Sequence, residues 1–339
     1  MSEKKMTSIG GQAVIEGIMM RGPEKIAVAV RKPDGDIIID ESEVKIKGGI
    51  RKIPFIRGVF SFVDSLVIGI KALMFSANFY DDDGNPKEEK ETEKIEKSEK
   101  SEKIDEKSKE NSKNKSKKKD EKQENEEMPG WMMALTIATS LCLSIGLFIA
   151  LPNLIAGFIV PGGAEDAGSN VVLYNLVESV VKMVIFLGYL ILVSRMKDIQ
   201  KVFEYHGAEH KTIFCYENGE ELTVENVKKF KRFHPRCGTS FLLFVIVISI
   251  IVFSIIGRFD SKILNMLIRI ALLPVVAGVS YEIIRFAGKH TENKCVSWLN
   301  KPGMWLQRLT TREPNEKQIE VAIEALKAVL PKEKDADNW

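Results

Sequence analysis

The chain has 339 residues, of which 45% are hydrophobic, and a formal net charge of +2. This length would suit two or three soluble domains, but the apolar residues are concentrated in a few long blocks, which excludes that organisation. The near-zero net charge says little about partners, because the charges are segregated along the chain.

The amino-terminal residues carry charge and no apolar core follows them, so we expect no cleaved secretory signal and a cytosolic start. Residues 8–50 are predicted to form a small β-rich unit. In it, the stretches "KIAVAVRK" and "IIIDESEV" flank a Pro-Asp-Gly sequence, which is typical of a β-hairpin.

Residues 53–80 are predicted to form one amphipathic helix. Arg57, Asp64 and Lys71 interrupt an apolar stripe with helical spacing. These charges favour a helix that lies in the membrane interface or against other helices over one that spans. The following residues, 81–128, are almost entirely charged or small and polar, and they cannot bury a core. They are expected to form a flexible tether, either a solvated spacer or a partner-binding tail.

Four apolar windows follow, near residues 131–151, 171–193, 240–257 and 263–287. Each is long enough, at about 1.5 Å per helical residue, to cross a hydrocarbon layer roughly 30 Å thick. The sequence therefore predicts a mainly α polytopic membrane protein with a four-helix membrane domain over residues 131–290, and its first partner is the lipid bilayer.

The distribution of basic residues predicts the orientation of these spans. The loop 152–170 has no lysine or arginine, whereas residues 194–239 have nine. Because basic loops stay inside, the second loop and both termini are expected in the cytosol of a bacterial cell, with the spans in its plasma membrane. The carboxyl-terminal segment 291–339 is expected to hold Trp298 and Trp305 at headgroup depth and to end in a short amphipathic helix.

The cytosolic loop contains the sequence "YHGAEH" in a stretch with helical apolar spacing. His206 and His210 lie one turn apart on the same face, as two imidazole ligands of zinc would, and Glu209 flanks them as a candidate general base. The order H-x-x-E-H is that of the inverted zinc-peptidase motif.

A third ligand is expected from the turn "RFHPRCGTSF", which contains His234 and Cys237. If both joined the pair, the site would be closed and structural, and if only one did, a position would remain open for water. His290 and Cys295 are further candidates.

A metal-free polar cluster is the alternative explanation, because histidines on an apolar stripe are often simply packed. Gly207 favours a built site. A glycine inside a helix costs about 1 kcal/mol relative to alanine, so its presence indicates that something approaches the helix backbone closely there.

Several charges lie inside the predicted spans. Glu178 and Lys182 are four residues apart and are expected to neutralise each other, facing the bundle interior. Glu282 lies nearer the end of the fourth span, with Arg269 and Arg285, for which snorkelling to the interface is the default expectation. A structural bridge between helices is favoured over an ion or proton pathway.

The segments "GGQAVIEGIMMRGP", "YHGAEHKTIFCYE", "FHPRCGTSFL" and "TREP" together resemble the YqhQ-like family of bacterial membrane proteins. The resemblance covers nearly the whole chain except the tether. It implies a domain of unknown function, often labelled a predicted metal-dependent enzyme on the strength of the same histidines.

Two functions are therefore carried forward. The first is a cytosol-facing, metal-dependent hydrolase with His206, His210 and His234 as ligands and Glu209 as base. The second is a non-enzymatic scaffold or biogenesis factor that acts with other membrane proteins, such as the translocon. The sequence has no basic stretch interleaved with aromatic residues, so we expect no nucleic-acid partner.

Overall fold

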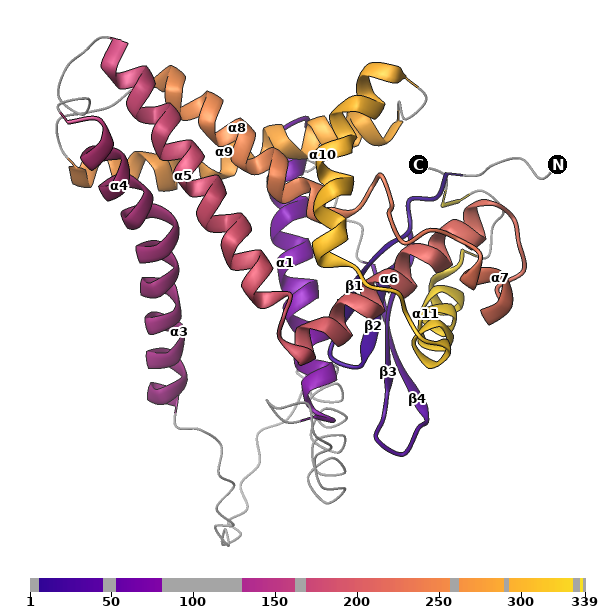
Figure 1. Ribbon diagram of the computed structural model, residues 1–339. Helices are drawn as coiled ribbons and strands as arrows, with labels where there is room; N and C mark the ends of the chain where they lie inside the picture. Colours follow the sequence, from indigo (N-terminus) through magenta and orange to yellow (C-terminus); the bar gives the residue numbers. More distant parts are fainter. Residues whose placement is uncertain are drawn as a thin grey trace, which may run out of the picture.

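The structure is a computed structural model that describes residues 6–44, 53–80, 130–161, 169–256, 262–289, 293–331 and 336–337. The predicted tether, 81–128, lies outside the described residues. In the described parts a small antiparallel sheet near the amino terminus is followed by helices, several of them long and apolar (Figure 1).

The four strands form a meander in the order β1-β2-β3-β4 and every neighbouring pair is antiparallel. The strands are β1 (Gly10–Val14), β2 (Gly17–Arg21), β3 (Lys25–Arg31) and β4 (Ile37–Glu43). The predicted hairpin is confirmed: β3 and β4 are joined by the Pro-Asp-Gly turn, where Gly35 has φ 99. A positive φ is accessible to glycine because it has no Cβ.

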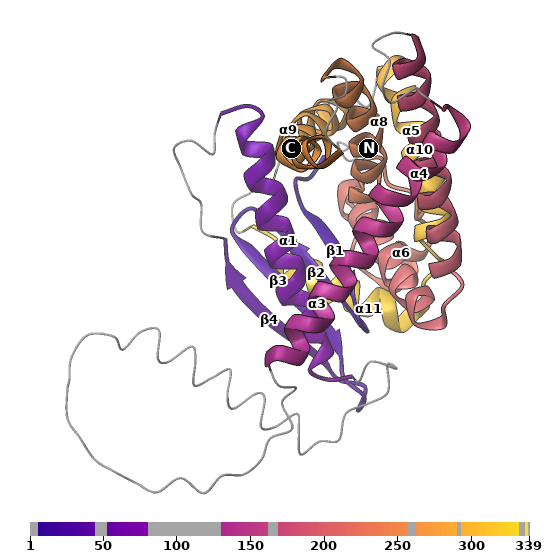
Figure 2. The ribbon, with the colours of Figure 1, turned by 90° about the vertical axis from the view of Figure 1, so that its left-hand side faces the viewer.

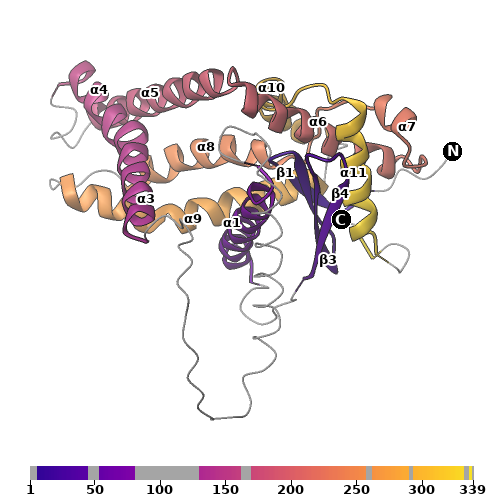
Figure 3. The same ribbon diagram turned by 90° about the horizontal axis from the view of Figure 1, so that it is seen from below.

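Helices cover both faces of the sheet (Figure 3). Residues alternate between the faces along a strand. Ile18 and Met20 pack under α6 (Lys197–Glu217) and α11 (Glu316–Val329), whereas Met19 and Val28 face α1 (Ile56–Ala77). This explains why the interior of β3 is apolar at every position, with both faces buried.

Four helical segments are long and apolar enough to cross a membrane: Ile56–Ala77, Ala138–Ile159, Val172–Val193 and Leu267–Ala287. They lie in α1, in the α3–α4 region, in α5 (Ser169–Val193) and in α9 (Lys262–Lys289). A shorter apolar stretch, Leu243–Ile256, lies in α8 (Gly238–Ile256), which packs along α9. These helices are compatible with a multi-pass membrane protein. The set includes α1, so the interfacial position expected for 53–80 stays a prediction.

The first predicted span ends too early. Helix α3 (Gly130–Ile145) continues through a π-helical turn, Gly146–Ala150, into α4 (Leu151–Ile159). The loop expected from Pro152 therefore starts after Ile159. A proline has no N–H to donate within a helix, and the wider π-helical turn before Pro152 accommodates it without ending the helix.

Helix α1 runs across α9 rather than beside it: Figure 2 views α9 nearly end-on while α1 stands upright. The two helices cross at Gly58 and Gly278: a Cβ on Gly58 would crowd the Gly278 backbone, and a Cβ on Gly278 would crowd the Phe55 carbonyl oxygen. Two further helices complete the described fold, the short α7 (Val224–Lys228) and α10 (Lys294–Thr310), and α10 packs on α8 and α9. Trp298 and Trp305 of α10 are exposed, so their predicted place at headgroup depth remains open to test.

Candidate metal centre

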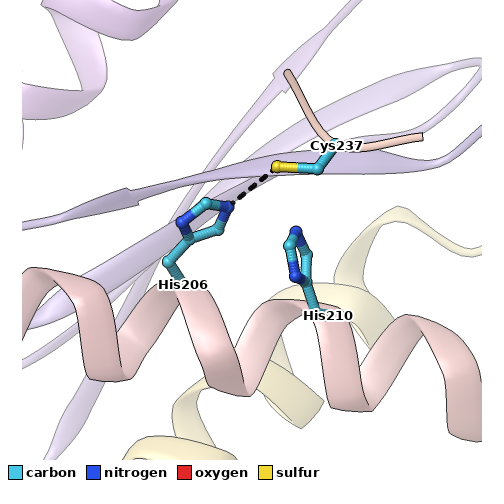
Figure 4. Close-up of side chains that lie close together, drawn as sticks. All are labelled: His206, His210 and Cys237. Carbon is cyan, nitrogen blue, oxygen red and sulfur yellow. Dashed lines mark hydrogen bonds between the residues drawn. The ribbon is translucent and has the colours of Figure 1, made fainter. Parts of the chain in front are cut away.

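Helix α6 carries the centre of the site. It is packed between the sheet, α11 and the segment 310–314, so that even its polar residues from Glu209 to Thr212 are buried. His206 and His210 lie one helical turn apart and point to the same side, as their spacing predicts (Figure 4). The helix ends at Asn218, and Gly219 follows with φ 67.

Cys237 completes a group of three potential ligands. The atoms that His206, His210 and Cys237 offer all lie within 4.8 Å of one another. The Cys237 Sγ lies 3.2 Å from the His206 Nε2, and the two imidazole ring centres are 4.4 Å apart (Figure 4). Cys237 comes from the turn before α8, so α6 and that turn together bring two nitrogens and one sulfur to one point.

The outer nitrogens of both rings are bound to backbone carbonyl groups. The His206 Nδ1 lies 2.8 Å from the Thr310 carbonyl oxygen, and the His210 Nδ1 pairs with the Arg232 carbonyl oxygen. A carbonyl only accepts, so each Nδ1 must carry the proton. In the neutral rings each Nε2 is then unprotonated and faces the Cys237 Sγ. This is the arrangement by which proteins orient histidines for a metal ion.

Glu209 lies beside the same point and is held from the sheet. Its Oε1 accepts a 2.9 Å hydrogen bond from the Gly11 backbone N–H. Its Oε2 lies 3.9 Å from the His206 Nε2 and 3.6 Å from the His210 Nε2. One oxygen of the buried carboxylate is therefore anchored, and the other faces the two histidines.

The thiol and the imidazole perturb each other. Burial alone would raise the pKa of the Cys237 thiol, but His206 and His210 beside it hold that pKa well below its usual value. Burial alone would lower the pKa of His206, but the Cys237 sulfur opposite raises it to about 9. The metal-free protein thus favours a thiolate–imidazolium pair, and thiolate is the form that binds metals.

His234, also predicted as a ligand, lies outside the three-residue group. Its Nδ1 accepts a hydrogen bond from the Arg236 N–H, and its Nε2 lies 3.5 Å from a carboxylate oxygen of Glu217. Burial, with His210 nearby, lowers its pKa to about 4. After the tight turn at Pro235, Cys237 faces His206 in the middle of α6, whereas the His234 Nε2 faces Glu217 at the carboxyl end of the same helix. Of the two residues that could have joined the pair, only Cys237 does so.

The structure does not describe the side chains of the other two candidates, which come from the carboxyl-terminal part of the chain. His290 lies outside the described residues, as does the side chain of Cys295, whose backbone belongs to α10. Cys215, the remaining cysteine of the central loop, is buried away from the group, where burial raises its pKa to about 11.

The predicted close approach at Gly207 is confirmed. A Cβ on Gly207 would lie less than 3.0 Å from the Arg312 carbonyl oxygen, a backbone atom. The Arg312 N–H donates a 2.8 Å hydrogen bond to the Phe203 carbonyl at the same place. Gly207 therefore lets the segment 310–314 lie directly on α6, and this contact brings the Thr310 carbonyl to His206.

Sequence reasoning missed two positioning groups, the Gly11 N–H and the Thr310 carbonyl oxygen. A sequence signal existed for the first, the glycine at position 11 in "GGQAV". The structure explains it, because a Cβ at this position would be crowded by the Met19 backbone and the Glu209 side chain. No sequence signal identified Thr310, because any residue offers a carbonyl oxygen.

The charges inside the long apolar helices form bridges between helices. Glu178 of α5 pairs through both carboxylate oxygens with Arg269 of α9, and Lys182 lies farther away, at 3.8 Å from Glu178. The snorkelling expected for Arg269 is thus wrong, because a buried carboxylate is within its reach. Glu282 of α9 pairs with Arg57 of α1.

A cavity of about 650 Å³ opens beside the three-residue group. It is lined by β1 and β2, by the histidine face of α6, by the turn at residues 234–239 and by α1. The potential ligands are therefore accessible to a small molecule rather than sealed in the core.

Comparison with known proteins agrees with the resemblance noted above. Residues 53–332 match a family described as "Protein of unknown function (DUF1385)". The chain belongs to this family. It is also 33% identical over 343 residues to the "Uncharacterized protein YqhQ" of Bacillus subtilis (strain 168), with 97% of this chain and 95% of that protein covered. No solved structure matches the chain.

All three potential ligands and Glu209 lie within the part of the chain that matches the DUF1385 family. The β1 strand with Gly11 precedes that part, and the match to the Bacillus subtilis relative extends over nearly the whole chain. Neither comparison carries a description of activity, so the geometry of the site has to support any functional conclusion.

Proposed function

We propose that this chain is a multi-pass membrane protein in which His206, His210 and Cys237 hold a divalent metal ion, with zinc favoured, and Glu209 acts as general base in a hydrolysis. One observation carries the proposal. The Nδ1 of each histidine pairs with a backbone carbonyl oxygen, the His206 Nε2 lies 3.2 Å from the Cys237 Sγ, and the ligand atoms that the two histidines and Cys237 offer all lie within 4.8 Å of one another. Simple packing does not require both rings to be oriented in this way.

The donor set suits zinc better than other common ions. Two imidazole nitrogens and one thiolate are ligands that zinc prefers, whereas magnesium and calcium select oxygen. Three protein ligands leave a fourth position open, which is typical of catalytic rather than structural zinc sites. When bound, such an ion supplies Lewis acidity that polarises a substrate oxygen and makes water more acidic.

Glu209 is positioned to take the proton from an attacking water. Its Oε1 is held by the Gly11 N–H, so its Oε2 keeps a fixed direction toward the open side of the histidine pair. The carboxylate that receives the proton can then pass it to the leaving group, which is the usual exchange of base and acid roles in hydrolysis. The cavity beside it has room for the substrate.

The contacts of the fold support the proposed membrane orientation. The sheet, α6 and α11 pack into one core, so they belong on one side of the membrane. The chain must then cross the membrane an even number of times between the sheet and α6. Three long apolar helical stretches lie between them, α1, α3–α4 and α5. If α3–α4 and α5, which pack together, both cross the membrane, α1 does not cross it and lies along the interface. Between α6 and α11 the same argument makes α8 and α9 cross together. We place the common side, with both termini, in the cytosol of a bacterial cell.

The test is elemental analysis of the full chain purified without chelators. We expect about one equivalent of zinc in the unaltered protein and in Glu209→Gln, and loss of zinc in His206→Ala. Cys215→Ser is the matched control for Cys237→Ser, because Cys215 is equally buried but lies outside the group. Absence of stoichiometric zinc, manganese or iron, with normal cellular function of Glu209→Gln, would remove the proposal.

A scaffold for other membrane proteins is the second candidate, and the exposed apolar residues of α1 and α5 favour it. Crosslinking in intact membranes separates the two. A stable protein neighbour, together with purified protein that contains no metal, would favour the scaffold. Turnover of a small molecule without such a neighbour would exclude it.

A further inference from the structure

The cavity beside the metal centre continues into a second, more apolar one. The second has a volume of about 440 Å³ and lies between α1 and the start of α8. Gln12, Ser65, Cys237 and Tyr281 line both cavities. A single molecule could therefore occupy both, with one end beside Cys237 and the other along α1.

The second cavity is a groove with an apolar wall. Its α1 side includes Phe62, Leu66, Ile70 and Leu73, all of which are exposed. Phe241 of α8 also lines it, with its ring centre 5.8 Å from that of Phe62 and the two rings tilted by 32°. In the proposed orientation α1 lies along the membrane interface, so the groove opens to the acyl chains of the cytosolic leaflet. A hydrocarbon chain is the partner that such a wall suits best.

An extended peptide is a poorer fit than a lipid. A peptide would bind by adding a strand to β1, the edge strand of the sheet that lines the cavity. That edge is already covered by α6, and the Gly11 N–H donates to the Glu209 carboxylate instead of facing the cavity unpaired. Strand addition at this point would take away the hydrogen bond that holds Glu209.

Two arginines line the polar end of the cavity, and within the part of the chain that the structure describes one of them has no ionic partner. Arg21, at the end of β2, lines the cavity and forms no ion pair within the described residues. The other arginine there, Arg236, pairs with Glu217. A guanidinium group at the wall attracts a phosphate or carboxylate.

From these contacts we infer that the two cavities together bind one anionic membrane lipid. Its acyl chain lies in the groove along α1, and its head lies between Arg21 and the His206–His210–Cys237 group. The inference rests on the proposed function in two respects, because the groove opens to the cytosolic leaflet only in the proposed orientation, and the lipid is a substrate only if that group holds a metal. Binding of the lipid itself does not depend on the metal.

Photocrosslinking of the full chain tests the inference. The protein is placed in nanodiscs of phosphatidylcholine with a small amount of phosphatidylglycerol that carries a diazirine at the end of one acyl chain. We expect labelling of the peptides containing Leu66 and Phe241 that excess unlabelled phosphatidylglycerol suppresses. Labelling of the exposed outer face, for example at Leu192, should not be suppressed, because bulk lipid contacts it without saturation.

Two matched variants locate the site. Leu66→Trp fills the groove, and Val63→Trp adds the same indole to an equally exposed position of α1 outside it. Suppressible labelling should fall about tenfold in Leu66→Trp, equivalent to about 1.4 kcal/mol, and should be unchanged in Val63→Trp. Thermal unfolding of both variants checks that the fold survives. Labelling that excess lipid does not suppress, or that Leu66→Trp leaves unchanged, would overturn the inference.

Two further arms test the head and the link to the metal. In Arg21→Ala, phosphatidylglycerol should compete no better than phosphatidylcholine, and an unchanged preference would refute the anionic head. If an apolar helical peptide suppresses the groove labelling and phosphatidylglycerol does not, the lipid proposal is overturned in favour of a peptide ligand. In His206→Ala the zinc should be lost while groove labelling remains, so failure of the metal proposal and failure of the lipid proposal give different results.

Discussion

Replacement of Gly207 by alanine tests whether the segment 310–314 really positions the metal centre. In an exposed helix this change would stabilise the protein by about 1 kcal/mol, because alanine is the better helix former. Here the new Cβ would lie less than 3.0 Å from the Arg312 carbonyl oxygen, and a backbone atom cannot rotate away as a flexible side chain can.

The expected effect is a net destabilisation of about 1–3 kcal/mol. Overpacking of a close contact costs about 1–3 kcal/mol. Displacement of the segment also weakens the hydrogen bonds from the Arg312 N–H to Phe203 and from His206 to the Thr310 carbonyl, each worth about 1 kcal/mol. The sum outweighs the gain in helix propensity, and zinc affinity should fall as well, because outer hydrogen bonds of metal-binding histidines contribute roughly 10–100-fold.

The assay is thermal unfolding in detergent combined with zinc content. Gly188→Ala is the control: Gly188 lies within α5, and a Cβ there meets no atom within 4 Å. Only Gly207→Ala should lower both the unfolding temperature and the zinc content. If Gly207→Ala matches or exceeds the unaltered protein in both, the segment 310–314 does not hold His206 and the reasoning is wrong.

Three more outcomes follow from buried charges and thiols. In metal-free protein Cys237 should react with iodoacetamide well before Cys215, because the pKa of Cys237 is lowered whereas that of Cys215 is raised to about 11. Added zinc should protect Cys237, and peptide mass spectrometry distinguishes the two cysteines. His234 has a pKa of about 4 when folded against an ordinary 6.5, so the unfolded state binds its proton more tightly. The neutral, buried His234 therefore stabilises metal-free protein fully above pH 6.5, and on the order of 3 kcal/mol of the free energy of unfolding should be lost as the pH falls toward 4. Urea unfolding should show a smaller loss in His234→Gln. Glu178→Gln should destabilise the protein by about 3 kcal/mol, because it leaves Arg269 without its ionic partner. In thermal unfolding, the double variant with Arg269→Gln should lose less stability than the sum of the two single changes. Simple additivity would show that the bridge contributes nothing to stability.

Local patterns in the sequence were sufficient for much of the fold. The β3–β4 hairpin, the α6 helix with its end at Asn218, and the long apolar helices all depend on spacing and turn chemistry within a few residues. The histidine pair belongs to the same class, because two residues four apart on a helix share a face wherever the helix is placed. Where a local signal was ambiguous, the prediction was less accurate: Pro152 suggested a loop, but the π-helical turn before it lets the helix continue.

The sequence by itself determined most of the elements and two of the three potential metal ligands, His206 and His210. Only the tertiary structure decided that Cys237 and not His234 faces them, that Gly11 holds Glu209, that Thr310 orients His206, and that Arg269 neutralises Glu178. The physical reason is the same in each case. These partners belong to different elements, so their distance depends on how the sheet, α6 and the segment 310–314 pack, and periodicity along one element carries no information about that packing.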